Sequence, residues 1–211
     1  MAHSYSSIST FEKCPREYEA RYVTKTVKFT GNEHTRRGDR IHKALEAYVK
    51  SETDTPPAPS EAPADGLHEV LRALRAAGVP VEVEQSLAIT KNLEPCGFWD
   101  KDAYLRGKLD VTIHLPDMTV ALDYKSGKRS NNKLQAAVYS AMLQAHAPGK
   151  QVVTYFDYLG KGRDEPIRGD KGDIMEVMAK AAAVDAATVF PPRPSRLCGW
   201  CPVKTCEFNE S

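Results

Sequence analysis

The sequence has no marked excess of either charge, no long apolar segment and few cysteines. Its 211 residues include 29 Lys or Arg and 28 Asp or Glu, which leaves a formal net charge of +1. This balance excludes a protein that binds nucleic acid through its total charge, although a local basic patch is compatible with it. No apolar run approaches the ~20 residues that cross a bilayer, and the first residues lack the apolar core of a signal peptide. We therefore expect a soluble cytoplasmic protein without a membrane partner.

The chain length suits one domain, 1–211, that can bury a core without disulfides. In a cytoplasmic protein the five cysteines are expected as thiols or metal ligands. Residues 51–64 contain four prolines and almost no bulky apolar side chain. This composition cannot bury itself and predicts an exposed linker. The proline- and cysteine-rich tail, 191–211, also predicts irregular structure.

The spacing of apolar residues predicts a mixed α/β fold. Helical spacing is found first, and alternating spacing begins after Pro80. The predicted helices cover 10–23 (with Ser9 as the N-cap), 34–51, 67–78, 131–146 and 174–190, and the predicted strands cover 81–89, 103–115, 119–125 and 152–159. The alternation places Val81, Val83, Leu87 and Ile89 on one face, and likewise Leu105, Leu109, Val111, Ile113 and Leu115. We expect a mainly antiparallel central sheet flanked by helices, with a helical N-terminal part.

The two strands around Pro116 predict a pair of opposed carboxylates. If 103–115 and 119–125 form a hairpin, the numbers of opposed residues add up to 233, which places Asp110 opposite Asp123. Opposed side chains have Cβ atoms about 4.5–5.5 Å apart, so two carboxylates there need a cation or a proton between them. Lys125 projects from the same face as Asp123. Glu84 on the neighbouring strand could complete the cluster, although Glu82 lies on the same face.

Such a cluster of carboxylates suits a hard divalent cation, Mg²⁺ or Mn²⁺. An adjacent lysine can help to position or deprotonate a water molecule and can stabilise negative charge on phosphorus. The residues therefore indicate phosphodiester hydrolysis. The alternative interpretation is a solvated face of an edge hairpin, whose charges have no chemical role.

The order of these segments resembles a known family. Glu84, then 107–110 (GKLD), 123–125 (DYK) and 135–139 (QAAVY), is similar to the PD-(D/E)xK nuclease superfamily. More narrowly, the sequence is similar to RecB-like exonucleases, which include the CRISPR-associated RecB-like exonucleases and the nuclease domain of AddB. Segments 4–22 and 36–48 resemble the N-terminal signature of that branch. The resemblance extends from about residue 4 to residue 208 and implies a bacterial, archaeal or phage protein.

The resemblance implies a role for each candidate residue. It implies divalent-metal ligands at His42, Asp110 and Asp123. Asp123 stands where many relatives have Glu, a change that keeps a carboxylate ligand. It also implies catalytic roles for Lys125, Glu84, Gln135 and Tyr139. Gln135 and Tyr139 are one helical turn apart and can project together.

Three cysteines form a compact group in the tail, as Cys198-x2-Cys201-x4-Cys206. Cys14, near the other end of the chain, is the natural fourth ligand. Four thiolates suit either Zn²⁺ or an iron–sulfur cluster, and spacing does not decide between them. The resemblance implies a 4Fe-4S cluster that acts as a clasp between the first helix and the tail. Cys96 has no partner in this scheme and is read as an ordinary thiol.

We therefore expect a metal-dependent exonuclease that acts on single-stranded DNA or DNA ends. A non-catalytic DNA-end-binding accessory of CRISPR adaptation or recombination is the alternative, and an electron-transfer protein would leave the carboxylates unexplained. A protein partner from those processes and an oligomeric assembly are both compatible with the sequence. Weak DNA contacts are expected from Arg36, Arg37, Arg40, Lys128 and Arg129. Aromatic residues that could stack on unpaired bases are Tyr5, Phe11, Tyr18, Tyr22 and Trp99, and the alternative interpretation for them is core packing.

Overall fold

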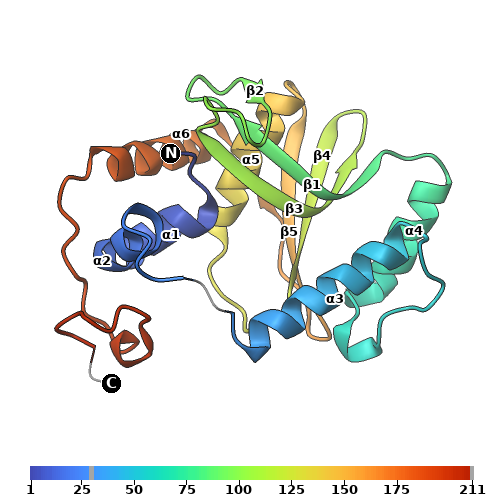
Figure 1. The fold of residues 1–211 in the computed structure, drawn as a ribbon. Helices are drawn as coiled ribbons and strands as arrows, with labels where there is room; N and C mark the ends of the chain where they lie inside the picture. Colours follow the sequence, from blue (N-terminus) through green and yellow to red (C-terminus); the bar gives the residue numbers. More distant parts are fainter. Residues whose placement is uncertain (29–30, 210–211) are drawn as a thin grey trace.

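The computed structural model describes residues 1–28 and 31–209 and shows a sheet with helices on both sides (Figure 1). The helices are α1 (Tyr5–Lys13), α2 (Pro15–Tyr18), α3 (Glu33–Val49), α4 (Leu67–Ala76), α5 (Lys133–His146) and α6 (Lys171–Ala186), and a π-helical turn, Glu19–Val23, follows α2. The strands are β1 (Val81–Ile89), β2 (Pro95–Cys96), β3 (Leu105–His114), β4 (Met118–Lys125), β5 (Gln151–Tyr158), β6 (Gly162–Arg163) and β7 (Ile167–Arg168). None of the helices in the described ranges has the length and apolar content needed to cross a membrane.

The sheet is mixed and mainly antiparallel, as predicted. Its strand order is β2-β1-β3-β4-β5-β6, with β7 also paired to β5. Only the β4–β5 pair is parallel within the described part of the chain. Helix α5 connects these two strands, because parallel neighbours need a crossover. The crossover brings α5 across the sheet next to the end of β4.

Two hydrophobic clusters occupy opposite faces of the sheet. Ala121 of β4 packs in a cluster with α5 and α6, whereas its neighbour Leu122 packs in a cluster with α3 and α4. Successive residues of a strand point to opposite faces, so the two clusters are separated by the sheet. Figure 1 shows the same arrangement, with α1, α5 and α6 to one side and α3 and α4 to the other.

Strands β1 and β3 change faces midway, contrary to the sequence prediction. Leu109 packs with the α5 cluster but Val111 packs with the α3 cluster, although regular alternation would put both on one face. The partner strand, β1, changes faces at the same level, because Val83 packs with the α3 cluster and Leu87 packs with the α5 cluster. Glu84 lies at this level with a φ of +56°, a left-handed conformation that interrupts regular alternation. The prediction of one apolar face along each of these strands was therefore wrong.

The first predicted helix, 10–23, was also wrong in its start and continuity. Helix α1 begins after Ser4, whose side chain accepts a hydrogen bond from the backbone N–H of Ser7. It ends at Cys14, which has an extended backbone, and Pro15 then starts α2. A proline has no N–H to donate, so it suits the first position of a new helix. The break leaves Cys14 between two helices.

Within the described residues, the linker and the tail lack long regular elements. In 51–64 the described structure is limited to 3₁₀ turns, and the segment is held at its ends. The Arg72 guanidinium donates to the Thr53 carbonyl, and the Gly160 N–H donates to the Ala62 carbonyl. The tail contains a 3₁₀ turn, Cys198–Trp200, and Figure 1 shows it beside α2. Residues 210–211 of the predicted tail lie outside the described residues.

Candidate functional site

The β3–β4 hairpin has the predicted register. The pairs run from Val111 opposite Leu122 to His114 opposite Thr119, and each adds up to 233. Asp110 and Asp123 are the next positions, but the ladder ends before them. Instead, Oδ2 of Asp110 accepts a hydrogen bond from the backbone N–H of Tyr124 at 2.7 Å. The Asp110 carboxylate is therefore fixed against the end of β4.

His42, Glu84 and Asp110 form a compact group of metal-ligand type. One ligand atom from each lies within 4.8 Å of the others, and Nδ1 of His42 is 3.2 Å from Oδ1 of Asp110. The three residues come from α3, β1 and β3. Glu82, the competing carboxylate of β1, is exposed and is not part of this group. The face change at Glu84 thus explains which glutamate reaches the site.

The other predicted residues form a hydrogen-bonded network around Asp123. This carboxylate is only 4% exposed. Its Oδ2 accepts hydrogen bonds from Nε2 of Gln135 at 2.7 Å and from the hydroxyl of Tyr139 at 2.6 Å. Nζ of Lys125 lies 2.6 Å from its Oδ1 and also donates to Oε1 of Gln135 at 2.8 Å. Helix α5 therefore positions the carboxylate and the lysine of β4 through two side chains one turn apart.

The charges of the His42–Glu84–Asp110 group and of the network around Asp123 affect one another. Burial and the neighbouring charge of Asp110 raise the pKa of Asp123, against the opposing effect of Lys125. Burial, Asp110 and Glu46 raise the pKa of Glu84 in the same way. Burial acts to lower the pKa of His42, but its hydrogen bond to Asp110 and the surrounding carboxylates outweigh burial and raise it. Beyond burial, the mutual repulsion of these carboxylates contributes to the shifts at Asp123 and Glu84, and a cation between them would relieve it.

The donors of this site fit a hard divalent cation. Carboxylate oxygens with one imidazole suit Mg²⁺ or Mn²⁺. Oδ1 of Asp123 is buried and, despite its short ion pair with Lys125, has no donor aligned for a hydrogen bond. It keeps acceptor capacity that a cation could use. Asp123 is not in the compact group with His42, Glu84 and Asp110, so the predicted ligands fall into two adjoining sets.

Lys108 is a site residue that the sequence prediction did not include. Its Nζ lies 3.7 Å from Oε2 of Glu84, and its side chain is 62% exposed. The backbone carbonyl of Lys108 also accepts from the Tyr139 hydroxyl, at 3.4 Å. The available signal was its position two residues before Asp110, which places it beside the site on the same strand.

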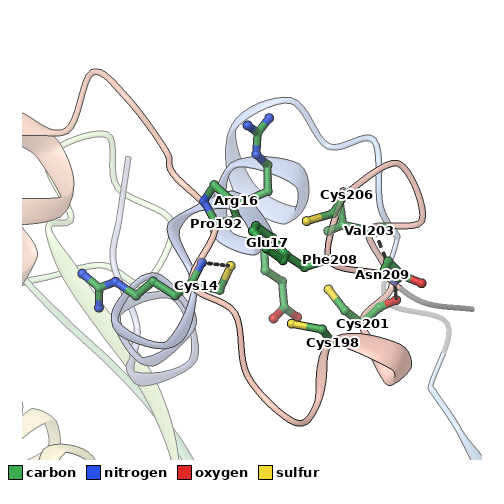
Figure 2. A pocket seen from close by; sticks show the side chains of 11 residues that line it. Cys14, Arg16, Glu17, Pro192, Cys198, Cys201, Val203, Cys206, Phe208 and Asn209 are labelled. Carbon is green, nitrogen blue, oxygen red and sulfur yellow. Dashed lines mark hydrogen bonds between the residues drawn. The ribbon is translucent and has the colours of Figure 1, made fainter.

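The four predicted cysteines line one pocket between α2 and the tail (Figure 2). Figure 2 shows Cys198, Cys201 and Cys206 on the tail, with Cys14 reaching the pocket from the helical side. Backbone N–H groups of Arg193 and Ser195 donate to the sulfurs of Cys14 and Cys198, at 3.4 and 3.2 Å. No three of these sulfurs, all within the described ranges, lie within 4.8 Å of one another. Cys96 lies apart from them, on β2.

The predicted basic residues have different surroundings. Arg37 pairs with Glu61 at 3.0 Å, and Arg129 pairs with Asp164 and stacks on the ring of Tyr158. These contacts hold the linker and the loop after β4, which reduces their availability to DNA. The remaining three are exposed and have no ion-pair partner within residues 1–28 and 31–209: Arg36, Arg40 and Lys128.

Comparisons with known proteins agree with this geometry. The family described as the PD-(D/E)XK nuclease superfamily matches residues 2–206. The fold is similar to the crystal structure of a protein called SSO0001, with a TM-score of 0.56 and 15% identity, covering 100% of this chain and 87% of that one. It is also similar to a "Putative exonuclease" from Eubacterium rectale, with a TM-score of 0.50 and 10% identity, covering 99% and 86%. None of the curated proteins matches the sequence.

Proposed function

Because the chain belongs to the PD-(D/E)XK nuclease superfamily, we propose that it is a divalent-metal-dependent exonuclease acting on single-stranded DNA or DNA ends. The observation that carries the proposal is the Lys125–Asp123 pair, held by Gln135 and Tyr139 beside the His42–Glu84–Asp110 group. A protein that only binds DNA ends does not require a lysine fixed against a buried carboxylate. This arrangement favours catalysis over the accessory role.

Each side chain has a role in this proposal. His42, Glu84, Asp110 and Asp123 would hold Mg²⁺ or Mn²⁺, which would supply Lewis-acid stabilisation of negative charge on the phosphate. Lys125 carries an ammonium whose remaining donor capacity can bind a phosphate oxygen or the attacking water. Gln135 and Tyr139 orient Asp123, since both donate to its Oδ2. The hydrolysed bond is the P–O bond of the backbone, and water provides the new oxygen.

A test of this function uses end-labelled single-stranded and duplex DNA with chelator, Mg²⁺ or Mn²⁺. We expect stepwise shortening from an end only when the metal is present, and faster shortening of single strands. Lys125→Ala should not cut. Lys171→Ala, an exposed lysine at the start of α6, is the charge-matched control and should cut normally. A wild-type protein that binds DNA ends but cuts none of these substrates with either metal would favour the accessory role.

We also propose that the four pocket cysteines hold a 4Fe-4S cluster, as the resemblance to RecB-like exonucleases implies. Four thiolates also suit zinc, and the resemblance to that branch is what favours the iron–sulfur cluster. Amide hydrogen bonds to Cys14 and Cys198 support thiolate ligands, because donors stabilise negative sulfur. The cluster would join the α1–α2 break to the tail and so contribute folding energy.

A further inference from the structure

An exposed aromatic and basic surface lies on the sheet beyond the candidate active site. Trp99, in the segment between β2 and β3, is 81% exposed. The guanidinium of Arg106 lies 4.9 Å from the centre of the Trp99 ring and 5.2 Å from that of Phe98. The two rings meet edge to face at 5.0 Å. Arg106 and Phe98 therefore hold the indole in place while most of it stays open to solvent.

Arg106 and Lys108 point away from α5. The residues that alternate with them, Leu105 and Leu109, pack in the α5 cluster. Gly107 faces α5 as well, since a Cβ atom there would come within 2.9 Å of Met142. The two basic side chains therefore project from the opposite face of β3.

That half of the opposite face is open around Lys108. Lys108 pairs across the ladder with Ser86 of β1, and both residues are exposed. Helices α3 and α4 instead pack on the other half of these strands, which includes Val81 and Val111. The open half begins at the candidate active site, because Lys108 contacts Glu84.

The basic side chains and the indole form one row. In the regular part of β3, Lys108 and Arg106 are separated by about 6.6 Å, the rise of two strand residues, and Lys108 contacts Glu84 of the candidate active site. The row ends at the Trp99 ring, which Arg106 contacts. Two acidic residues, Asp100 and Asp102, lie in the same segment as Trp99, and the Asp100 carboxylate accepts from the Gly97 N–H at 2.6 Å.

We propose that Lys108, Arg106 and Trp99 form a subsite for unpaired nucleotides next to the scissile phosphate. A base would stack on the open face of Trp99, and the two cations would bind backbone phosphates. The inference rests on the proposed nuclease function and adds the residues that would bind an unpaired strand. Stacking on an indole needs a base face that is free, which a single strand offers and a paired duplex does not. Because Arg106 already fixes the ring, little side-chain freedom is lost on binding.

The two tryptophans of the chain allow a direct test. Trp200, in the cysteine-rich tail, is 87% exposed and is the matched control. In Trp200→Phe the only tryptophan is Trp99, and we expect oligothymidylate, added with a chelator to prevent cleavage, to quench its emission. In Trp99→Phe only Trp200 reports, and we expect no quenching. Quenching of Trp200 alone, or of neither residue, would overturn the subsite.

Affinity provides the second measurement. By fluorescence anisotropy of labelled oligothymidylate, Trp99→Ala should weaken binding about tenfold or more, as for loss of one stacked base, whereas Trp200→Ala should not. Arg106→Ala should weaken binding and reduce its salt dependence. Binding to blunt duplex should change little in Trp99→Ala. If Trp99→Ala bound single strands with unchanged affinity, the subsite would be refuted. If Trp99→Ala dissociated a dimer in sedimentation without any change in DNA binding, the surface would be an interface between two copies of the chain.

The subsite and the proposed function can fail separately. Hydrolysis of the p-nitrophenyl ester of thymidine 5′-monophosphate, which is too small to reach Trp99, should be the same in wild type and Trp99→Ala. If the wild type hydrolyses DNA but Trp99→Ala binds single strands normally, only the subsite is refuted. If oligothymidylate quenches Trp99 in a protein that cuts nothing, the subsite stands and the nuclease proposal is refuted.

Discussion

The Nζ atom of Lys125 lies 2.6 Å from Oδ1 of Asp123, inside a network that leaves the carboxylate almost without solvent contact. A buried charge of this kind is tolerated when its partner and its hydrogen bonds are all present. Lys125 is also the member of the pair that retains some exposure, at 24%. The geometry therefore joins a shielded carboxylate to a lysine that can reach substrate.

Removing the Lys125 ammonium should stop hydrolysis without removing DNA binding. Lys125→Met keeps most of the side-chain volume, and we expect the rate of cleavage of bound single strands to fall by roughly 10²-fold or more. Affinity measured with a chelator should fall only slightly, because one phosphate contact among several is a small share. If affinity collapsed while bound DNA were cut at the normal rate, Lys125 would be a binding residue.

The Tyr139 hydroxyl is expected to position Asp123. Tyr139→Phe removes a 2.6 Å hydrogen bond to a buried carboxylate while it keeps the ring. The free energy of unfolding in urea should fall by about 1–3 kcal/mol, the range for a buried acceptor that loses a donor. Tyr22→Phe, in the turn after α2, should change it little. Stability and cleavage both equal to wild type in Tyr139→Phe would contradict this role.

The melting temperature of Glu84→Gln, measured with and without metal, should distinguish repulsion between Glu84 and Asp110 from metal binding by Glu84. Without metal, Glu84 stands close to Asp110, so Glu84→Gln should raise the melting temperature of the metal-free protein. Mn²⁺ or Mg²⁺ should raise the melting temperature of the wild type, because the folded state binds the ion, and should raise that of the variant much less. Glu82→Gln is the control on the same strand and should respond to metal like the wild type. An equal metal-induced rise in Glu84→Gln would remove Glu84 from the site.

The parts of this site that depend on regular strand pairing could be predicted from the sequence. The parts that depend on the irregular backbone at Glu84 could not. The register of β3 and β4 follows from a short turn, so the positions of Asp110 and Asp123 were predictable. The face change at Glu84 depends on a left-handed residue inside a strand, which alternation cannot reveal. The pairing of Lys108 with Glu84 across this distortion was missed for the same reason. Prediction therefore failed where the backbone leaves its regular geometry, which is also where the site lies.

The cysteine pocket gives a prediction that joins the two ends of the chain. Protein purified without oxygen should be brown and contain about four irons per chain if all four thiolates bind one cluster. Cys14→Ser should lose iron as fully as Cys201→Ser, because either change leaves three ligands. Cys96→Ser should keep both colour and iron. A colourless anaerobic preparation with one zinc per chain would show that the cysteines bind zinc and not an iron–sulfur cluster. A full iron content in Cys14→Ser would exclude Cys14 as a ligand.

The N-terminal residues are joined to α6 through His3 and Asp185. His3 is 1% exposed, and its Nε2 lies 2.9 Å from Oδ1 of Asp185. Burial lowers the pKa of His3, and the opposing effects of the hydrogen bond and charge of Asp185 do not compensate. Nδ1 is buried without a partner, so a second proton there would have no acceptor. The native state therefore favours the neutral imidazole.

The sign of the pH dependence follows from linkage. The unfolded chain takes up a proton on His3 below about pH 6.5, where the native state resists it, so the unfolded state binds more protons and stability falls with falling pH. His3→Gln keeps a polar side chain that does not titrate. In urea titrations, the stability advantage of wild type over His3→Gln should be constant above about pH 7 and should shrink as the pH falls below about 6.5. His34→Gln, at an exposed position of α3, should follow the wild-type curve. An advantage that stays the same from pH 7.5 to pH 5 would mean that His3 contributes packing and hydrogen bonding but not a shifted titration.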